Sequence, residues 1–166
     1  MSTAAVKITT PTECEILITR TFNAPRELVW QTLSDPELLK KWLFGPPGWT
    51  MTVCEEDQRP GGTFRWAWSG PDEAEMVMSG VYREISPPER VVRTEKFEFG
   101  CAPQAGEQVA TLVLTEQNDK TLLTLSIIYP SKEARDGALA SGMDKGLEAG
   151  YARLETILAE RRSERN

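Results

Sequence analysis

The side chains that could do chemistry in this sequence are carboxylates, arginines, tyrosines and cysteines, because the chain contains no histidine. Histidine is the commonest general base near neutral pH and a common metal ligand, so its absence removes the Ser-His-Asp and Cys-His arrangements. The sequence also has no HExxH, GxSxG, GxGxxG or P-loop pattern. We therefore expect no catalytic residue, no metal and no cofactor, and a binding role is favoured over an enzyme.

The three cysteines, Cys14, Cys54 and Cys101, are widely spaced and form no CxxC pair. This pattern predicts reduced, structural thiols and neither a disulfide framework nor a zinc site. The first residues lack the basic and apolar blocks of a signal peptide, and no apolar run approaches the ~20 residues that cross a bilayer. We expect a cytoplasmic protein without a membrane partner.

The net charge is −6 and the pI is about 4.9. Nucleic acid favours concentrated lysine and arginine, so the average surface would repel it. The charge therefore argues against a nucleic-acid partner.

Three charged residues fall on apolar faces of predicted strands. Arg20 shares the alternation of Ile16 and Ile18, and Arg93 and Glu95 share that of apolar neighbours in residues 90–99. These residues are candidate polar groups of a cavity. A register slip of one residue would turn each of them outward, so an exposed charge is the alternative.

Aromatic and methionine side chains follow the same period of two on three predicted strands, 63–69, 75–85 and 90–99. Such side chains can line an apolar pocket, and methionine adapts to irregular ligands. The same side chains also fill ordinary hydrophobic cores. For each residue taken singly, both a pocket-lining role and a core role stay open.

The last segment predicts a long helix that begins after Ser131. Its apolar arc runs from Met143 to Leu158 and contains glycines spaced four residues apart, at 142, 146 and 150. The glycines predict either close packing on the sheet or a hollow beside the helix. If a hollow exists, we expect a filled core near Leu158 and open volume nearer Met143.

The other predicted helices and strands determine where these strand and helix faces lie in the fold. A strand is predicted at 13–22, two short helices within 24–33 and 34–42, and further strands at 49–55, 63–69, 75–85, 90–99, 108–116 and 121–129, with closely spaced turns that favour an antiparallel meander. The RPGG turn at 59–62 is interpreted as structural. The candidate cavity-lining residues are Trp42, Trp49, Phe64, Trp66, Trp68, Met76, Met78, Phe97, Phe99, Met143, Gly146, Leu147, Gly150 and Tyr151.

Four stretches together carry a resemblance: RTFNAPRELVWQTLSDPELLKKW, DQRPGGTFRW, GVYREISPPERVV and SGMDKGLEAGYARLETIL. In order along the chain, they resemble the homologues of the C-terminal domain of the activator of Hsp90 ATPase, within the START-like or Bet v 1-like superfamily. The resemblance implies an α+β helix-grip fold, in which a curved antiparallel sheet wraps the long C-terminal helix and leaves a cavity between them. It supplies no catalytic motif.

The expected organisation is a flexible N-terminus (1–12), a single domain (13–162) and a C-terminal tail (163–166). Our first functional hypothesis is a binding module for a hydrophobic or aromatic small molecule. One alternative is a protein-interaction role, such as regulation of an Hsp90-type chaperone ATPase in a stress response. Another is a histidine-independent enzyme, a cyclase or hydrolase that uses Glu95 and Arg93. The sequence leaves open whether the protein is a monomer or a homodimer.

Overall fold

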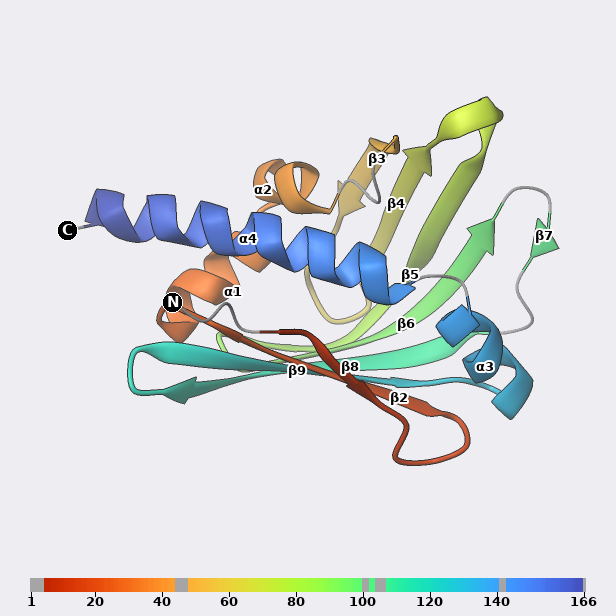
Figure 1. The fold of residues 1–166 in the computed structure, drawn as a ribbon, viewed down its shortest axis with the longest axis horizontal. Coiled ribbons are helices and arrows are strands. Elements are labelled where there is room, and N and C mark those ends of the chain that lie inside the picture. The colour runs from red at the N-terminus through yellow and green to blue at the C-terminus, as the bar shows by residue number, and fades with distance from the viewer. Residues whose placement is uncertain (1–4, 44–47, 100–101, 104–106, 141–142, 166) are drawn as a thin grey trace.

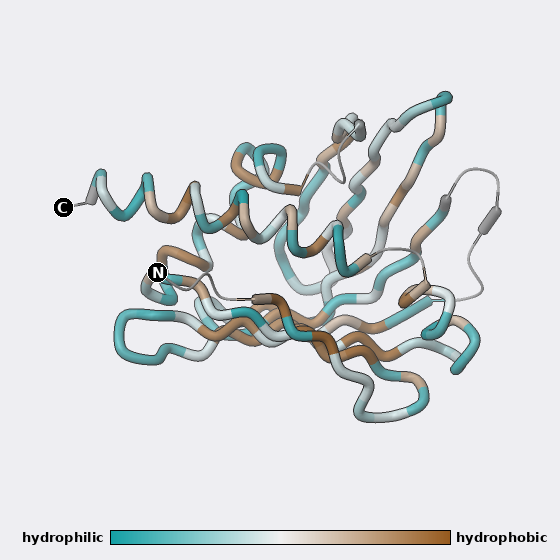
Figure 2. Tube along the Cα trace, viewed as in Figure 1, coloured by the Kyte–Doolittle hydropathy of each residue, from teal (hydrophilic) through white to brown (hydrophobic). Residues whose placement is uncertain are grey.

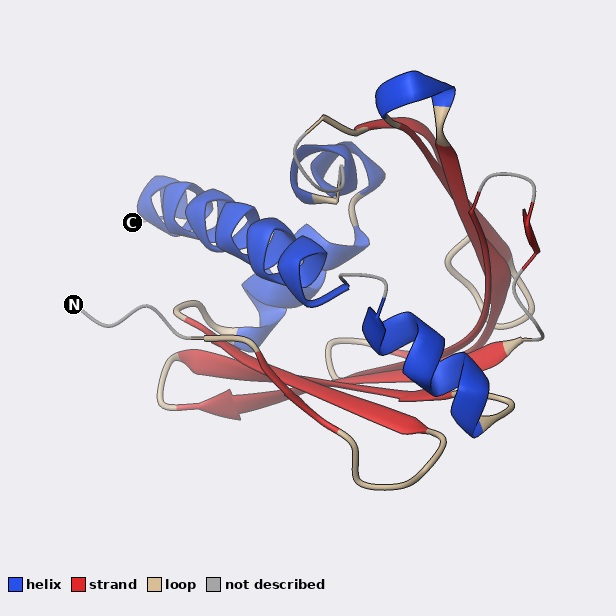
Figure 3. Cartoon of the chain, turned by 45° about the vertical axis from the view of Figure 1, so that its right-hand side comes forward, coloured by secondary structure: helices blue, strands red, loops and turns tan. Residues whose placement is uncertain are grey.

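One antiparallel sheet, bent into two steeply inclined halves, dominates the structure (Figure 3). The computed structural model describes residues 5–43, 48–99, 102–103, 107–140 and 143–165. In this part of the chain nine strands pair in the order β1-β2-β9-β8-β6-β5-β4-β3, with β7 added beside β6. Their bounds are β1 (Lys7–Thr9), β2 (Glu15–Phe22), β3 (Thr50–Glu56), β4 (Thr63–Ser69), β5 (Glu75–Ser86), β6 (Arg90–Phe99), β7 (Ala102–Pro103), β8 (Gln108–Gln117) and β9 (Lys120–Ile128).

The helices lie inside the bend of the sheet. They are α1 (Arg26–Ser34), α2 (Pro36–Trp42), α3 (Lys132–Ala140) and α4 (Met143–Arg165), and a short 3-10 turn, η1, spans Pro71–Glu73. The long helix α4 crosses the concave face, with α1 and α2 beside it and α3 near its N-terminal end (Figure 1). This is the predicted helix-grip α+β fold.

Local sequence explains where the short elements begin and turn. The Asp35 side chain caps α2 by accepting a hydrogen bond from the backbone N–H of Glu37 at 2.9 Å, and Pro36 occupies the first turn. Between β3 and β4, Gly61 has φ of +86°, and a Cβ at Gly62 would lie 2.0 Å from the carbonyl oxygen of Asp57. The RPGG stretch is therefore a structural turn, and Arg59 pairs locally with Asp57 at 3.0 Å.

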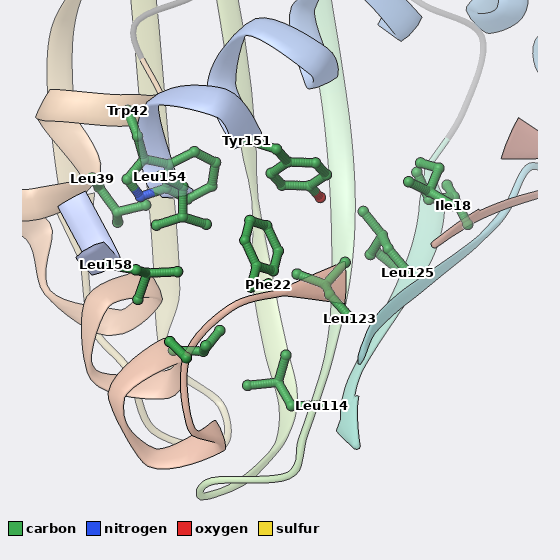
Figure 4. Close-up of a cluster of buried hydrophobic side chains, with 14 of the residues drawn as sticks. Ile18, Phe22, Leu39, Trp42, Leu114, Leu123, Leu125, Tyr151, Leu154 and Leu158 are labelled. Carbon is green, nitrogen blue, oxygen red and sulfur yellow. The ribbon is translucent and has the colours of Figure 1, made fainter. Parts of the chain in front are cut away.

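The main core lies between α4, α1 and the half of the sheet formed by β2, β8 and β9. Figure 2 shows apolar residues along the middle of these strands and recurring along α4, whereas the β8–β9 turn is hydrophilic. Leu154 and Leu158 of α4 are completely buried. The Tyr151 ring packs edge-on against Phe22, with centroids 5.5 Å apart, and stacks on Trp42 at 6.1 Å (Figure 4). This end of the molecule is filled.

Three boundaries differ from the sequence-based expectations. Residues 7–9 of the expected flexible N-terminus form β1, which pairs with β2. The last helix continues to Arg165, into the expected tail. The single helix expected after Ser131 is instead two helices, α3 and α4, with different directions in Figure 3. The sequence between them is Ser-Gly, and glycine has a low helix propensity.

Candidate functional site

A cavity of about 580 Å³ lies between the inner face of the sheet and the helices α2 and α4. Its walls come from segments far apart in the sequence, because the bend of the sheet brings β4, β5 and β6 opposite the start of α4. Most of the lining side chains are apolar or aromatic. Small-molecule sites in proteins commonly have this size and composition.

Most of the candidate residues from the sequence line this cavity. They are Trp42, Trp66, Trp68, Met76, Met78, Arg93, Glu95, Phe97, Met143, Gly146, Leu147, Gly150 and Tyr151. The open volume is thus nearer Met143, and Leu154 and Leu158 are fully buried in the core. The side chain of Phe99 and residue Gly142 lie outside the part of the chain that the structure describes.

Three candidate residues do not line the cavity. Phe64 is buried behind it, because its ring packs on those of Trp66 and Tyr82 and the Arg93 guanidinium lies over it at 5.4 Å. Trp49 lies against Gly70, where a Cβ would come within 2.5 Å of the indole. Alternation correctly places Phe64 on the inner face but does not show which inner-face residues the neighbouring side chains cover.

Arg20 is the third candidate residue that does not line the cavity. It is buried and links β2 to α4 through an ion pair. Its Nη1 lies 3.1 Å from Oε1 of Glu155, and the guanidinium lies 4.6 Å from the centroid of the Phe22 ring. The backbone N–H of Asn23 also donates to Glu155. Neither the cavity role nor the exposed alternative describes Arg20, which has a structural ion pair.

The sequence predicted two possible roles for the glycines of α4, close packing or a border of open volume. Each of the two described glycines has one of these roles. A Cβ at Gly150 would lie 3.2 Å from the carbonyl oxygen of Trp42, so this glycine permits close packing of α4 on α2. A Cβ at Gly146 would meet no atom within 4 Å. Gly146 therefore borders open volume, and a larger side chain there would project into the cavity.

A charged pair lies on the sheet wall. The Arg93 Nε donates to Glu95 Oε2 at 2.8 Å, and the Gln108 amide donates to Glu95 Oε1 at 2.9 Å. Gln108 is directly across from Glu95 in the β6–β8 register. Burial disfavours the Arg93 charge, but Glu95 and other nearby groups hold the pKa of Arg93 above its ordinary value. The ion pair is thus satisfied within the wall.

A second polar pair, Glu56 and Tyr82, lies beside this ion pair. The Tyr82 hydroxyl donates a short hydrogen bond to Oε2 of Glu56. Burial raises the pKa of the Glu56 carboxyl, and the Tyr82 hydrogen bond and the Arg93 charge oppose that rise. Burial also raises the pKa of the Tyr82 hydroxyl. Glu56 therefore ionises less readily than an ordinary glutamate.

Two further tyrosines of the lining stay protonated at physiological pH. Burial, the largest cause, raises the pKa of Tyr151 to about 12 and also raises that of Tyr129. The hydroxyl of Tyr151 points away from Trp42 (Figure 4). Both hydroxyls can donate or accept a hydrogen bond.

Three polar residues of the lining, Glu56, Gln108 and Tyr129, were not predicted from the sequence. Extending the alternation would have found all three, because Glu56 follows Cys54 on the inner face and Tyr129 follows Leu125 and Ile127. Gln108 has the parity of Ala110, Leu112 and Leu114, so the alternation of β8 also places it on the inner face.

Neither a metal cluster nor a membrane-spanning helix occurs among the residues that the structure describes. They contain no group of three or more cysteine, aspartate or glutamate side chains placed to hold a metal ion. No helix among them is both long and apolar enough to span a membrane.

Comparison with known proteins identifies the family. The model of the family described as activator of Hsp90 ATPase homolog 1-like protein matches residues 23–159. The chain belongs to this family. No match was found among the curated proteins.

Solved structures share the fold of this Hsp90-activator-like chain over nearly its whole length. A crystal structure of a Rhodobacter sphaeroides protein is 31% identical with a TM-score of 0.85, covering 94% of this chain and 99% of that one. A Nitrosomonas europaea protein is 26% identical with a TM-score of 0.78, covering 93% and 99%. A Mycobacterium smegmatis protein is 25% identical with a TM-score of 0.78, covering 92% and 97%.

Proposed function

We propose that this chain is a binding module for a hydrophobic or aromatic small molecule, held between the sheet and α4. The observation that carries the proposal is the cavity of about 580 Å³, which adjoins an otherwise well-packed core. Apolar surface buried by a ligand there would stabilise the complex at roughly 25 cal/mol per Å² before the costs of association. In β4 and β5, Trp66, Trp68, Met76 and Met78 contribute to that apolar surface.

Native mass spectrometry of the protein purified from its own host tests the proposal. We expect an additional mass in the native spectrum that is lost on denaturation, and its identification would name the ligand. A native mass equal to the denatured mass, together with no stabilisation by any member of an apolar compound library, would contradict the proposal.

A matched pair of glycine variants tests whether the cavity is the binding site. Gly146→Leu places a side chain in the cavity, whereas Gly137→Leu places one on an exposed position of α3 where a Cβ also meets no atom within 4 Å. We expect Gly146→Leu to lose the bound mass and Gly137→Leu to retain it. Equal retention in both variants would place the ligand elsewhere.

The family description favours a second candidate, stimulation of an Hsp90-type ATPase. The test is the ATPase rate of Hsp90 from the same host with increasing amounts of this protein. A saturable rise would support it. An unchanged rate, with no complex on gel filtration, would remove this candidate and leave the ligand-binding proposal unaffected.

A further inference from the structure

The polar groups of the cavity wall limit the chemistry of the ligand. Both carboxylate oxygens of Glu95 already accept hydrogen bonds, one from Arg93 and one from Gln108. One oxygen of Glu56 accepts from Tyr82. The acceptors on this wall are therefore largely occupied by neighbouring side chains.

Donors on the same wall are still available. A guanidinium has five N–H groups, and in Arg93 the Nε–H donates to Glu95 while neither Nη group donates to a residue that the structure describes. Both residues line the cavity, but the Arg93 side chain is 17% exposed and that of Glu95 only 3%, so the arginine is the more accessible member of the pair. The indole N–H of Trp66, another lining residue, is buried and makes no hydrogen bond of normal geometry, but it lies close enough to the Glu56 carboxyl to oppose the rise of that group's pKa, so it is not counted as an available donor.

Charge limits the ligand further. The Arg93 charge is already balanced by Glu95 at 2.8 Å. An anionic ligand would bring a second negative charge beside Glu95 and close to Glu56. A cationic ligand would be repelled by Arg93, and it would offer only hydrogen-bond donors to a wall whose unused groups are themselves donors. A neutral group that accepts hydrogen bonds meets neither difficulty.

Resting on the proposed function, we infer that the ligand is an uncharged molecule whose apolar body contacts Met76 and Met78 and whose carbonyl oxygen accepts a hydrogen bond from Arg93. The guanidinium lies 5.0 Å from the centroid of the Trp66 ring, which helps to hold it in place. Arg93 would thus orient the ligand, and the apolar lining would supply most of the affinity.

Four naphthalene probes of similar size test this inference by equilibrium dialysis against the wild-type protein at pH 7. They are 2-acetylnaphthalene, which is a neutral ketone, 2-ethylnaphthalene, which lacks the acceptor, 2-naphthoate and the ammonium form of 2-(aminomethyl)naphthalene. We expect the ketone to bind about tenfold more tightly than the ethyl compound, because a hydrogen bond to a charged donor contributes at least about 1.4 kcal/mol. The ketone should also bind more tightly than both ions.

A double variant, Arg93→Met with Glu95→Met, tests the role of the arginine. Removing both partners avoids leaving one buried charge unpaired, and hydrophobic replacement of a buried pair is often tolerated. The ketone should lose its tenfold advantage while the affinity for 2-ethylnaphthalene changes by less than about threefold. An advantage that persists in a folded double variant would overturn the role of Arg93. If the variant does not fold, the wild-type probe series decides.

The outcomes separate this inference from the proposed function. Equal affinity for all four probes, or tighter binding of either ion, would leave the binding module standing and overturn the neutral-carbonyl ligand. If none of the four probes binds, the neutral-carbonyl ligand is overturned, and native mass spectrometry decides whether the binding module stands.

Discussion

Glu56 is the cavity residue whose ionisation has the clearest link to stability. Its carboxyl is partly buried at the end of β3, and burial is the largest cause of its raised pKa. A raised folded-state pKa means that the folded protein holds this proton more tightly than the unfolded chain does. The contribution is therefore fully favourable at low pH and is lost as pH rises from the ordinary value through the raised one.

The variant Glu56→Gln should remove this pH dependence. As pH rises above about 4.5, the free energy of unfolding of the wild-type protein should fall relative to that of the variant. Urea unfolding at several pH values measures the difference. A difference that stays constant, or that grows in favour of the wild type as pH rises, would show that burial does not control this carboxyl.

The glycines of α4 allow a second test at single residues. Gly146→Ala adds a methyl group in open space and should raise the free energy of unfolding by up to about 1 kcal/mol through helix propensity. Gly150→Ala should give a clearly smaller gain or a loss, because its Cβ would crowd the Trp42 carbonyl at 3.2 Å. Thermal unfolding of both variants gives the comparison, and equal gains would contradict the assignment of the two roles.

At the level of elements, alternation and turn residues predicted the strands β2–β6, β8 and β9 because each has one buried face. The two register shifts, between Met51 and Val53 and between Tyr82 and Glu84, were not predictable, since an inserted residue leaves no periodic signal. The second shift changes which parity faces inward, so Tyr82 and Ile85 both line the cavity. The cavity-lining residues that alternation does not predict thus depend on these β-bulges and on which residues lie opposite one another in neighbouring strands.

The tie between β2 and α4 gives a prediction at this scale. Glu155→Ala leaves the Arg20 guanidinium buried without its carboxylate, and should lower the free energy of unfolding by about 2 kcal/mol. Glu160→Ala, at an exposed position of the same helix, is the control and should change it by less than about 0.5 kcal/mol. Chemical denaturation at neutral pH measures both. Equal effects would mean that the ion pair does not hold the helix on the sheet.

At the level of the whole molecule, the fold class and the order of elements could be predicted from the sequence, including the filled end at Leu154 and Leu158. The covering of Phe64 by Arg93 and the pairing of Glu95 with Gln108 could not, because they depend on side chains brought together from different strands. The bend of the sheet keeps β4 and β5 away from the main core, which leaves the cavity between these strands and α4.

That cavity makes the protein's stability sensitive to hydrostatic pressure. Pressure favours the state of smaller volume, and unfolding eliminates interior space that side chains do not fill. Gly146→Leu occupies part of that space and should therefore unfold at a higher midpoint pressure than the wild type, whereas Gly137→Leu should not, as tryptophan fluorescence under pressure would show. Identical midpoints in all three proteins would mean that the cavity adds nothing to the volume change. A bound ligand should act in the same direction as Gly146→Leu, so compression would distinguish the free protein from its complex.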